Sequence, residues 1–497
     1  MSKQNPIAGQ IGHGGNLMVN ATHVKSEGGG KALLFENTGT EFPVVTNMMG
    51  SSRRIAMALG VERLDDISAR IDSLLKEALS PKGSLWEKMR ALPLLADVAK
   101  WFPQSVAGRG ACQQVVWQGD EVDLERLPML HSWEADGGAF VTLPMVNTLD
   151  PETGMRNVGM YRMQRLDKRS TGMHWHIHKT GARHYDAYKR LGERMPVVVT
   201  LGGDPAYTYA ATAPMPDNMD EYLLAGFLRQ RPVRLVKALT CDIRIPEDCD
   251  FVIEGYVDPS EDKIIEGDFG DHTGFYSLKD LYPRFHVTCI THRRDAIYPA
   301  TVVGVPPQED AYIAEATERI FLAPIRLAVQ PEVRDLWMPV EGTAHNLAIV
   351  SIDKRYEGQA HKVAQSLWGA GQMMFNKYML IASAEDNIRS FSALGRLLRR
   401  VDLERDVMVS TVHCRTHEVC STGINTDVFL VDVLLMDCLC NKGAERCEHE
   451  SAHLRIDSGL AHSCRNEDLF KLLSYALTDL LDVVCCLVRP VVNAYPA

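Results

Sequence analysis

Six short apolar runs between Val115 and His292 constrain the fold of this chain more than any other feature of its sequence. Each run is rich in β-branched and aromatic residues and is bounded by Gly, Pro or Asp, which is typical of strands. The runs are VVW, FVTLPMVNTL, VVVTLGG, VRLVKAL, FVIEGYV and FHVTCITH. One segment, Met219 to Arg229, predicts a helix among them. We therefore expect a mostly antiparallel barrel or sandwich in this part of the chain.

The segments on both sides of these strands have α/β patterns. A length of 497 residues exceeds one ordinary hydrophobic core, so several domains are expected. The flanking elements that we expect are strands at 32–35 and 42–45, helices at 53–59 and 65–79, strands at 347–352 and 378–382, and helices near 357–368 and 388–398. The expected domains are a poorly ordered N-terminus (1–28), an N-terminal α/β domain with a connector (29–112), a central β domain (113–305), a C-terminal α/β domain (306–407) and a tail (408–497).

Charge and composition exclude several classes of protein. The net charge of −11 and the lack of any block of five Lys or Arg argue against a nucleic-acid surface. The first residues lack the apolar core of a signal peptide, and no uninterrupted apolar run reaches the roughly 18 residues needed to span a bilayer. Twelve cysteines in so long a chain are not disulfide-dense, so we expect mostly reduced thiols. We predict a cytoplasmic protein with at most peripheral membrane contact.

The loop EGDFGDHTG, from Glu266 to Gly274, contains the first candidate site. It places two carboxylates, Glu266 and Asp271, on either side of a Gly-Asp-Phe-Gly turn, with His272 adjacent. Two carboxylates that share a small site cannot both ionise easily, so we expect one of them to keep a raised pKa and to act as an acid. A solvated acidic loop is the alternative interpretation of the same residues.

Two further stretches carry candidate ligands. NVGMYRMQ, which begins at Asn157, predicts a strand on which Arg162 could pair with a carboxylate and bind a second one from a substrate. A purely structural ion pair is the alternative. HWHIH places His174, His176 and His178 on one face of an expected strand. That face suits either a metal site or a polar strand edge.

Four motifs together resemble those of the UbiD-like decarboxylases, which use prenylated FMN to remove or add CO₂ on aromatic and α,β-unsaturated acids. The motifs are NVGMYRMQ, the pair His178-Lys179, the helix DEYLLAGFLR and EGDFGDHTG. Their order and spacing match that family from about Gly29 to Val407. The resemblance implies α/β plus β architecture: an N-terminal α/β domain, a central split β-barrel like that of flavin reductases, and a C-terminal α/β domain used for oligomerisation.

The resemblance also assigns roles to single residues. It matches Arg162, Glu266 and Asp271 to the family's arginine and two acids. Arg162 would orient the substrate carboxylate, Glu266 would deliver a proton after CO₂ leaves, and Asp271 would tune Glu266 as a neighbouring charge.

The same resemblance implies a bound cofactor and metal ions. The ligands of a divalent metal, Mn²⁺ or Mg²⁺, that also holds the flavin phosphate would be Asn157, His178 and Glu221. Such oxygen and nitrogen donors suit these cations, although Glu221 by itself is also an ordinary helix-start carboxylate. A potassium ion (K⁺) is implied beside the metal. Residues implied to bind the cofactor and these ions are Thr142, Asn157, Met160, Tyr161, Arg162, His178, Ala211, Thr212 and Ala213.

The implied function is the non-oxidative decarboxylation of an aromatic acid. The chain looks closer to the branch that decarboxylates a polyprenyl-4-hydroxybenzoate in quinone (ubiquinone) synthesis than to the cinnamate-type enzymes. Two alternatives stay open: action on another aryl acid, in menaquinone synthesis or aromatic degradation, and a flavin- and metal-binding relative that has lost catalysis. The implied partners are the aromatic acid, a flavin prenyltransferase that supplies the cofactor, and further copies of the chain.

The sequence after Val407 departs from the family pattern. It holds eight of the twelve cysteines, five histidines, and apolar runs at 429–436 and 477–488. The spacing of these cysteines is not that of a common zinc finger, so no stoichiometric zinc is expected. Because the family's usual residues are missing here, we expect a dimer or a poorly defined oligomer rather than a larger ring, with weaker flavin retention.

Overall fold

A computed structural model describes most of the chain, apart from much of its two ends. The described residues are 30–79, 98–402, 405–412 and 430–436, together with the strands β1 (Ile11–Gly12) and β2 (Asn16–Leu17). β1 and β2 pair antiparallel, in the segment where we expected little order. The cysteines and histidines of the tail lie outside the described residues, as do the apolar run at 477–488 and residues 82–97 of the expected connector.

The N-terminal unit contains the two strands and two helices that the sequence predicts. They are β3 (Leu33–Phe35), β4 (Val44–Thr46), α1 (Ser52–Ala58) and α2 (Leu64–Leu79). The side chain of Ser51 accepts a hydrogen bond from the backbone N–H of Arg54, which caps α1. β4 pairs antiparallel with β3 and parallel with β21 (Tyr298–Ala300). The strand that follows the central sheet therefore completes the N-terminal one.

Among the described residues, nine strands form the central sheet. They are β6 (Val115–Gln118), β7 (Phe140–Val141), β8 (Met145–Leu149), β9 (Arg156–Met160), β10 (Met163–Asp167), β11 (Ser170–Gly172), β12 (Met195–Leu201), β15 (Phe251–Val257) and β20 (Arg284–His292). Their order is β7-β10-β11-β20-β15-β12-β8-β9, with β6 paired to β20. All of these pairings are antiparallel, which confirms the prediction for this region.

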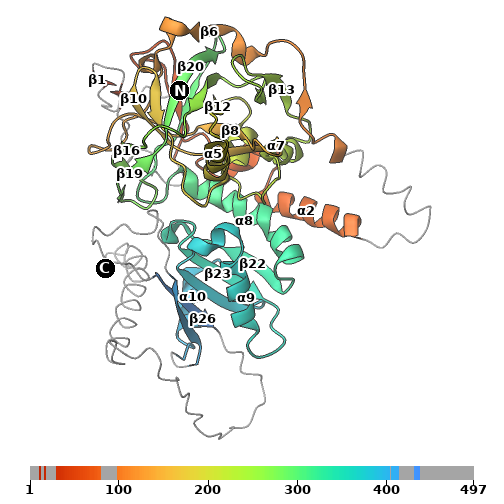
Figure 1. The fold of residues 1–497 in the computed structure, drawn as a ribbon. Helices are drawn as coiled ribbons and strands as arrows, with labels where there is room; N and C mark the ends of the chain where they lie inside the picture. Colours follow the sequence, from red (N-terminus) through yellow and green to blue (C-terminus); the bar gives the residue numbers. More distant parts are fainter. Residues whose placement is uncertain are drawn as a thin grey trace, which may run out of the picture.

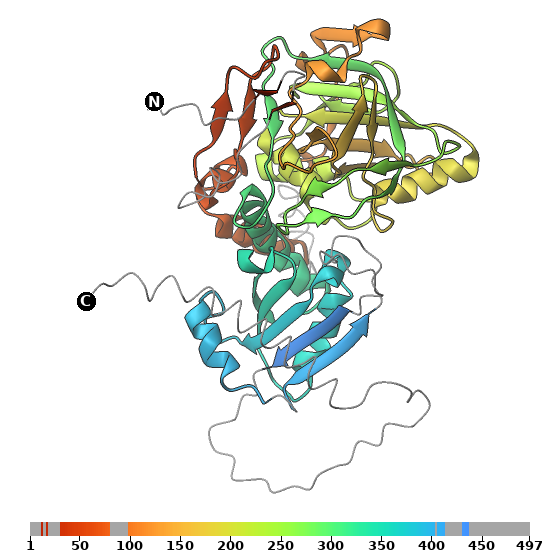
Figure 2. The same cartoon turned by 90° about the vertical axis from the view of Figure 1, so that its left-hand side faces the viewer.

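Two bends curl the central sheet into a half-barrel (Figures 1 and 2). Residues 142–144 connect β7 to β8, and residues 161–162 connect β9 to β10. Although these connections are short, β7 and β10 lie at one end of the strand order and β8 and β9 at the other. Met145 pairs with Met160 on one side of the bends, and Val141 with Met163 on the other. The two bends therefore lie next to each other, which places Thr142 and Arg162 in one neighbourhood.

The sequence predicts one helix in the central region, but the structure has three. They are α5 (Thr180–Leu191), α6 (Pro205–Thr212) and α7 (Glu221–Arg229). α6 is buried on nearly all sides, so it lacks the apolar stripe that marks an amphipathic helix. Its Asp204 cap and first-turn proline look like a turn in the sequence. α5 is mostly polar, and its buried face has few apolar side chains: Ala182, Tyr185, Ala187 and Tyr188.

Smaller elements complete the central region. One three-stranded sheet contains β5 (Gln104–Ser105), β13 (Arg234–Lys237) and β14 (Arg244–Pro246). Two hairpins are made by β16 (Ile264–Glu266) with β19 (Asp280–Tyr282), and by β17 (Phe269–Gly270) with β18 (Tyr276–Ser277). Short 3₁₀ helices occur at Ala111–Gln113, Gly119–Glu121, Leu124–Arg126, Val340–Gly342 and Gly371–Phe375.

The C-terminal unit is a five-stranded sheet with helices. Its elements are α8 (Glu309–Ala328), β22 (Val333–Trp337), β23 (Leu347–Ile352), α9 (Gln359–Trp368), β24 (Tyr378–Ser383), α10 (Phe391–Leu398), β25 (Val407–Val412) and β26 (Leu430–Met436). The strand order is β22-β23-β24-β26-β25. The boundary that we expected after Val407 falls within β25, and β26 brings residues 430–436 of the expected apolar run into the sheet.

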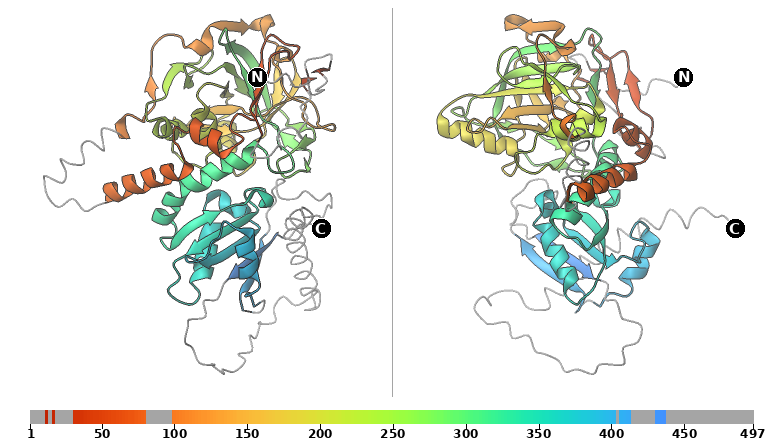
Figure 3. Two further views of the ribbon diagram at one scale, coloured as in Figure 1. Left: turned by 180° about the vertical axis from the view of Figure 1, so that it is seen from behind. Right: turned by 90° about the vertical axis from the view of Figure 1, so that its right-hand side faces the viewer.

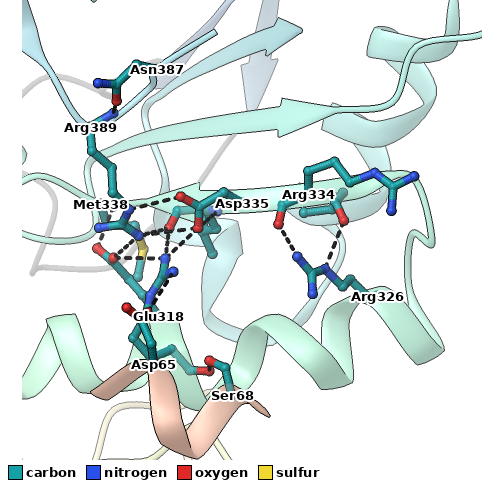
Figure 4. Close-up of polar contacts among 12 residues, drawn as sticks. Asp65, Ser68, Glu318, Arg326, Arg334, Asp335, Met338, Asn387 and Arg389 are labelled. Carbon is teal, nitrogen blue, oxygen red and sulfur yellow. Dashed lines mark hydrogen bonds and ion pairs between the residues drawn. The ribbon is translucent and has the colours of Figure 1, made fainter. Parts of the chain in front are cut away.

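Helix α8, which the sequence analysis did not identify, lies between the half-barrel and the C-terminal sheet (Figures 1 and 3). It packs against α1 and α2 and also contacts β22. Figure 4 shows polar contacts of α8 with the C-terminal unit and with α2. Arg319 donates to Asp335 at 2.7 Å, while Glu318 accepts from the backbone N–H of Met338 at 2.6 Å and from Arg389 at 3.1 Å. These buried charges fasten α8 to the C-terminal sheet.

Apolar packing follows the same division. One cluster of buried side chains lies on one face of the half-barrel, a second joins its other face to α1, α6, α7 and α8, and two smaller clusters fill the C-terminal unit. None of the helices in the described ranges is both long enough and apolar enough to cross a membrane.

Candidate active site

The acid loop, residues 266–274, is carried by the two hairpins. Alternation along β16 buries Glu266, which is 1% exposed, and turns Ile265 outward at 65% exposed. Gly270 packs against Trp133 so closely that a Cβ added there would lie 2.0 Å from the ring. The loop therefore needs a glycine at this position.

Arg162, in the bend between β9 and β10, joins the two acids of the loop. Its Nη2 and Nε donate to Oε2 of Glu266 at 2.8 and 3.2 Å, and its Nη1 donates to Oδ2 of Asp271 at 2.7 Å. Nη2 also donates to Ser277 at 2.9 Å, and the guanidinium lies 4.5 Å from the ring centre of Phe269. The structure thus brings together the three residues that the resemblance named.

The charge of Arg162 decides the ionisation of both acids. Burial by itself would raise the pKa of Glu266, but Arg162 and a hydrogen bond with His174 outweigh burial and hold it below its usual value. Burial of Asp271 is likewise outweighed, by its hydrogen bond with His272 and by Arg162, so its pKa is also lowered. The expectation of one raised pKa is therefore wrong here, because Arg162 and a neighbouring histidine, His174 for Glu266 and His272 for Asp271, lower each pKa by more than burial raises it.

We expected the three histidines of HWHIH to lie on a strand, but they do not. β11 ends at Gly172, and the histidines follow in a loop and a turn. Nδ1 of His174 lies 2.7 Å from Oε2 of Glu266, and its Nε2 contacts Nε2 of His176. The ring of His178 lies 4.8 Å from that of Phe375, in the C-terminal unit. His174 thus belongs to the acid site, while His178 faces another part of the molecule.

A second loop, residues 132–138, holds the acid loop in place, and the sequence analysis missed it. Asp136 accepts hydrogen bonds from the backbone N–H groups of Trp133 at 2.9 Å and Gly270 at 2.7 Å. Gly137 donates to the carbonyl of Asp268 at 2.7 Å. The only signal in the sequence is the turn pattern Asp-Gly-Gly, which does not show what the turn contacts.

Asn157 and Glu221 line a common pocket of about 260 Å³, part of which is open solvent. Other residues on its wall are Met155, Arg156, Thr180, Arg183, His184, Met215, Pro216, Asp217, Asn218 and Met219. Burial raises the pKa of Glu221 to about 8, although the backbone N–H of Val158 donates to this carboxylate at 2.8 Å. His178 is not on this wall, but it lies two residues before Thr180, which is.

The other expected cofactor residues lie in or near the two bends and at the end of α6. Tyr161 is buried beside Arg162, and its hydroxyl lies 3.4 Å from both Nδ2 of Asn157 and the N–H of Gly181. Thr142, in the neighbouring bend, accepts the N–H of Thr301 at 3.0 Å. The remaining members of the expected set are Met160, the last residue of β9, and Ala211, Thr212 and Ala213 at the end of α6, which packs on β9.

Asn157 and Arg162 therefore stand at the two ends of one short run that links the pocket to the acids. Within the ranges that the structure describes, no three His, Cys, Asp or Glu side chains are grouped as a metal site. The set that we expected contains only two such residues and an amide.

Comparisons with known proteins show which family the chain matches. Three family models match in order: the 3-octaprenyl-4-hydroxybenzoate carboxy-lyase N-terminal domain at 19–71, the Rift-related domain at 104–306 and the C-terminal domain at 311–437. The chain belongs to the UbiD family. The members named by these models are carboxy-lyases. The match begins before Gly29 and continues past Val407, the limits that we expected for the resemblance.

Individual UbiD relatives cover most of the chain. An uncharacterised protein of Aquifex aeolicus (strain VF5) is 48% identical over 390 residues, which is 78% of this chain and 79% of that one. The UbiD-class enzyme HmfF from Pelotomaculum thermopropionicum, solved in complex with FMN, has a TM-score of 0.69 at 24% identity and covers 85% of this chain and 88% of its own. Vanillic acid decarboxylase from Sedimentibacter hydroxybenzoicus, in a closed form, has a TM-score of 0.71 at 23% identity over 92% of both chains.

Proposed function

We propose that this chain is a prenylated-FMN-dependent, non-oxidative decarboxylase of an aromatic acid, with a polyprenyl-4-hydroxybenzoate-type substrate. The observation that carries the proposal is Arg162, held between Glu266 and Asp271 at a bend of the half-barrel. A buried guanidinium with fixed donors is suited to orienting a substrate carboxylate. Membership of a carboxy-lyase family supports the reaction type.

The pocket at Asn157 and Glu221 fits the metal and phosphate end of the proposed cofactor. Glu221 is 7% exposed, and its pKa stays raised because burial outweighs the N–H of Val158 and the charge of Arg156. A carboxylate and an amide oxygen are donors that Mn²⁺ and Mg²⁺ prefer. We assign Asn157, Glu221 and His178 as metal ligands and place K⁺ near the residues 211–213 at the end of α6.

Chemistry at the acid site is divided between cofactor and protein. Prenylated FMN, when bound, supplies the electron sink that an aryl acid lacks as CO₂ leaves. Arg162 orients the substrate carboxylate, and Glu266 gives a proton to the carbon atom from which CO₂ leaves. Oε1 of Glu266 is buried without a hydrogen-bond partner in the described part of the chain, so this carboxylate keeps a free acceptor. Asp271 accepts from Nη1, on the other side of the guanidinium, and Ser277 accepts from Nη2, which also donates to Glu266.

Exposed apolar side chains beside the acid site support a substrate with a long apolar group. Ile265 and Leu281 face each other across the β16–β19 hairpin and are 65% and 51% exposed. Phe275, which directly follows the acid loop, and Ile177, in the histidine-containing loop, are 56% and 83% exposed. Such side chains would bind a polyprenyl tail through burial of apolar surface.

The test is CO₂ release by protein co-expressed with a flavin prenyltransferase. Prenylated 4-hydroxybenzoates are compared with 4-hydroxybenzoate, vanillate and 3,4-dihydroxybenzoate, and the ultraviolet–visible spectrum reports bound flavin. Higher kcat/KM for the prenylated acids supports the whole proposal. Turnover restricted to the unprenylated acids keeps the decarboxylase and rejects the substrate. Bound flavin without any CO₂ release favours the alternative of a binding protein.

A further inference from the structure

Decarboxylation replaces CO₂ with a proton, so a reaction of the proposed type consumes one proton in every turnover. The following inference rests on that proposed function. Glu266 is 1% exposed and has a lowered pKa, so it is ionised at neutral pH and must be protonated again in each cycle. The site therefore needs a group that delivers protons to this buried carboxylate.

Oε2 of Glu266 has hydrogen bonds to two side chains, Arg162 and His174. A guanidinium remains protonated in proteins, so Arg162 cannot supply a proton. An imidazole gains and loses protons in the physiological range. Nδ1 of His174 lies 2.7 Å from Oε2, which is within reach for direct transfer.

The fold fixes the His174 ring in this position. Its backbone N–H donates to the carbonyl of Arg162 at 3.4 Å, and the preceding N–H, of Met173, donates to Pro283 at 3.0 Å. The ring packs on Tyr282 with centroids 4.3 Å apart, and the side chain is 9% exposed. The titratable and charged groups that face His174 are Glu266 from β16, Arg162 from the bend after β9, Tyr282 from β19 and His176 from its own loop.

We propose that His174 supplies the proton that Glu266 passes to the substrate. In its doubly protonated form, the ring donates from Nδ1 to Glu266 and from Nε2 to His176, which satisfies both of its contacts. Transfer breaks the Nδ1–H bond and forms an O–H bond at Oε2, leaving a neutral ring and a neutral carboxyl group. The carboxyl group turns and gives this proton to carbon as CO₂ departs. The proton that the net reaction consumes then enters from a solvent hydronium ion and restores the doubly protonated ring. His174 acts only through Glu266 and is a positioning residue.

Two substitutions of His174 separate proton supply from orientation. In His174→Asn, the amide nitrogen takes the place of Nδ1 and keeps a hydrogen bond to Glu266. Its N–H protons are not acidic enough to be transferred. His174→Phe removes both properties. The matched control is His286→Asn, since His286 forms a histidine–glutamate pair with Glu261 at the similar distance of 2.8 Å, outside the site.

We expect both His174 variants of the flavin-loaded protein to lose at least about tenfold in kcat, within the ~10²–10⁴-fold range of acid–base catalysis. KM and flavin content stay within about twofold of the parent. The parent's kcat falls as pH rises, because the doubly protonated ring is lost, and this fall is absent in His174→Asn. The control behaves like the parent. If His174→Asn keeps kcat within about threefold and an unchanged pH profile, His174 only orients Glu266 and the proposal is overturned.

A second measurement does not depend on activity. ¹⁵N-histidine NMR of the cofactor-free protein, with His174 assigned by its absence in His174→Asn, reports whether the ring carries a proton on both nitrogens, as the proposal requires. In Glu266→Gln the ring should become neutral, because the carboxylate that favours its charge is gone. A neutral ring in the parent overturns the proposal. A charged ring in a flavin-loaded protein that releases no CO₂ supports the pair and rejects the proposed function instead.

Discussion

The two polar regions of the site, around Glu266 and around Glu221, shift the pKa of a buried glutamate in opposite directions. Glu266 is buried next to Arg162 and His174, and its pKa is lowered. Glu221 is buried next to the N–H of Val158, and this contact and the charge of Arg156 do not offset its burial, so its pKa rises to about 8. The first region is thus neutralised by the protein's own charges and is organised before a ligand binds. In the function that we propose, a metal ion completes the second region, and the stability of that region would then depend on this ligand.

Removing the shared cation of the first region should have the largest effect. Arg162→Ala leaves two buried carboxylates without their partner, which costs about 3–5 kcal/mol in the free energy of unfolding. It also removes the carboxylate-binding group, so turnover should fall by about 10³-fold or more. Urea unfolding and CO₂ release measure the two effects. Arg169→Ala, which breaks an exposed pair with Asp120, is the control and should change neither. Parent-like turnover in Arg162→Ala would contradict the assigned role.

Removing only the acid should separate chemistry from binding. Glu266→Gln should retain flavin and metal but lose ~10²–10⁴-fold in CO₂ release, because the side chain keeps its shape and loses its transferable proton. The double variant with Arg162→Ala should be little worse than either single variant, since the two residues act as a unit. The matched control is Glu261→Gln, outside the site. Turnover within about threefold of the parent in Glu266→Gln would exclude Glu266 as the proton donor.

Glu221, in the second region, should make the free energy of unfolding depend on pH. The pKa of Glu221 is raised from 4.5 to about 8 in the folded protein, so folding favours its protonated form. Its contribution to stability is full below pH 4.5 and is lost as pH rises towards 8, by up to about 1.4 kcal/mol per pH unit. Metal-stripped Glu221→Gln should lack this loss, measured by urea unfolding at several pH values.

Manganese supplies the control for that experiment. Mn²⁺ should restore the stability of the parent at pH 8, because it compensates for the ionised carboxylate, and should do little for Glu221→Gln. A parent protein whose stability is flat between these pH values, or that gains nothing from Mn²⁺, would show that Glu221 is compensated without a metal.

The smallest expected effect separates the histidines of the two regions. His178→Ala should lower the Mn²⁺ and flavin content of purified protein by about tenfold, as loss of one ligand weakens a metal site. His174→Ala should leave both contents unchanged, because its contact is with Glu266. Metal analysis and the flavin spectrum measure these contents. Equal loss in both variants would mean that the two regions are not separate.

The antiparallel central strands and most flanking elements could be predicted from the sequence, because alternation and helical periodicity are local properties. β23 and β15 occupy the predicted residues, and α9 lies within two residues of its prediction. α8 and α6 were missed because helices buried on several sides lack the one-sided apolar stripe on which the prediction depends. The role of α8 between the two units depends on Arg319, Asp335 and other residues distant in sequence.

For the site, the sequence by itself determined the chemical types of the groups. The motifs placed Arg162, Glu266 and Asp271 in loops and strands and, through their resemblance to UbiD enzymes, named them as a set. Only the tertiary structure decided how they ionise, since a pKa depends on which charges are adjacent in space. The bend after β9 places one guanidinium between both acids, so neither pKa is raised. The contact of His174 with Glu266 spans 92 residues of sequence, and no local pattern encodes a hydrogen bond between segments that far apart.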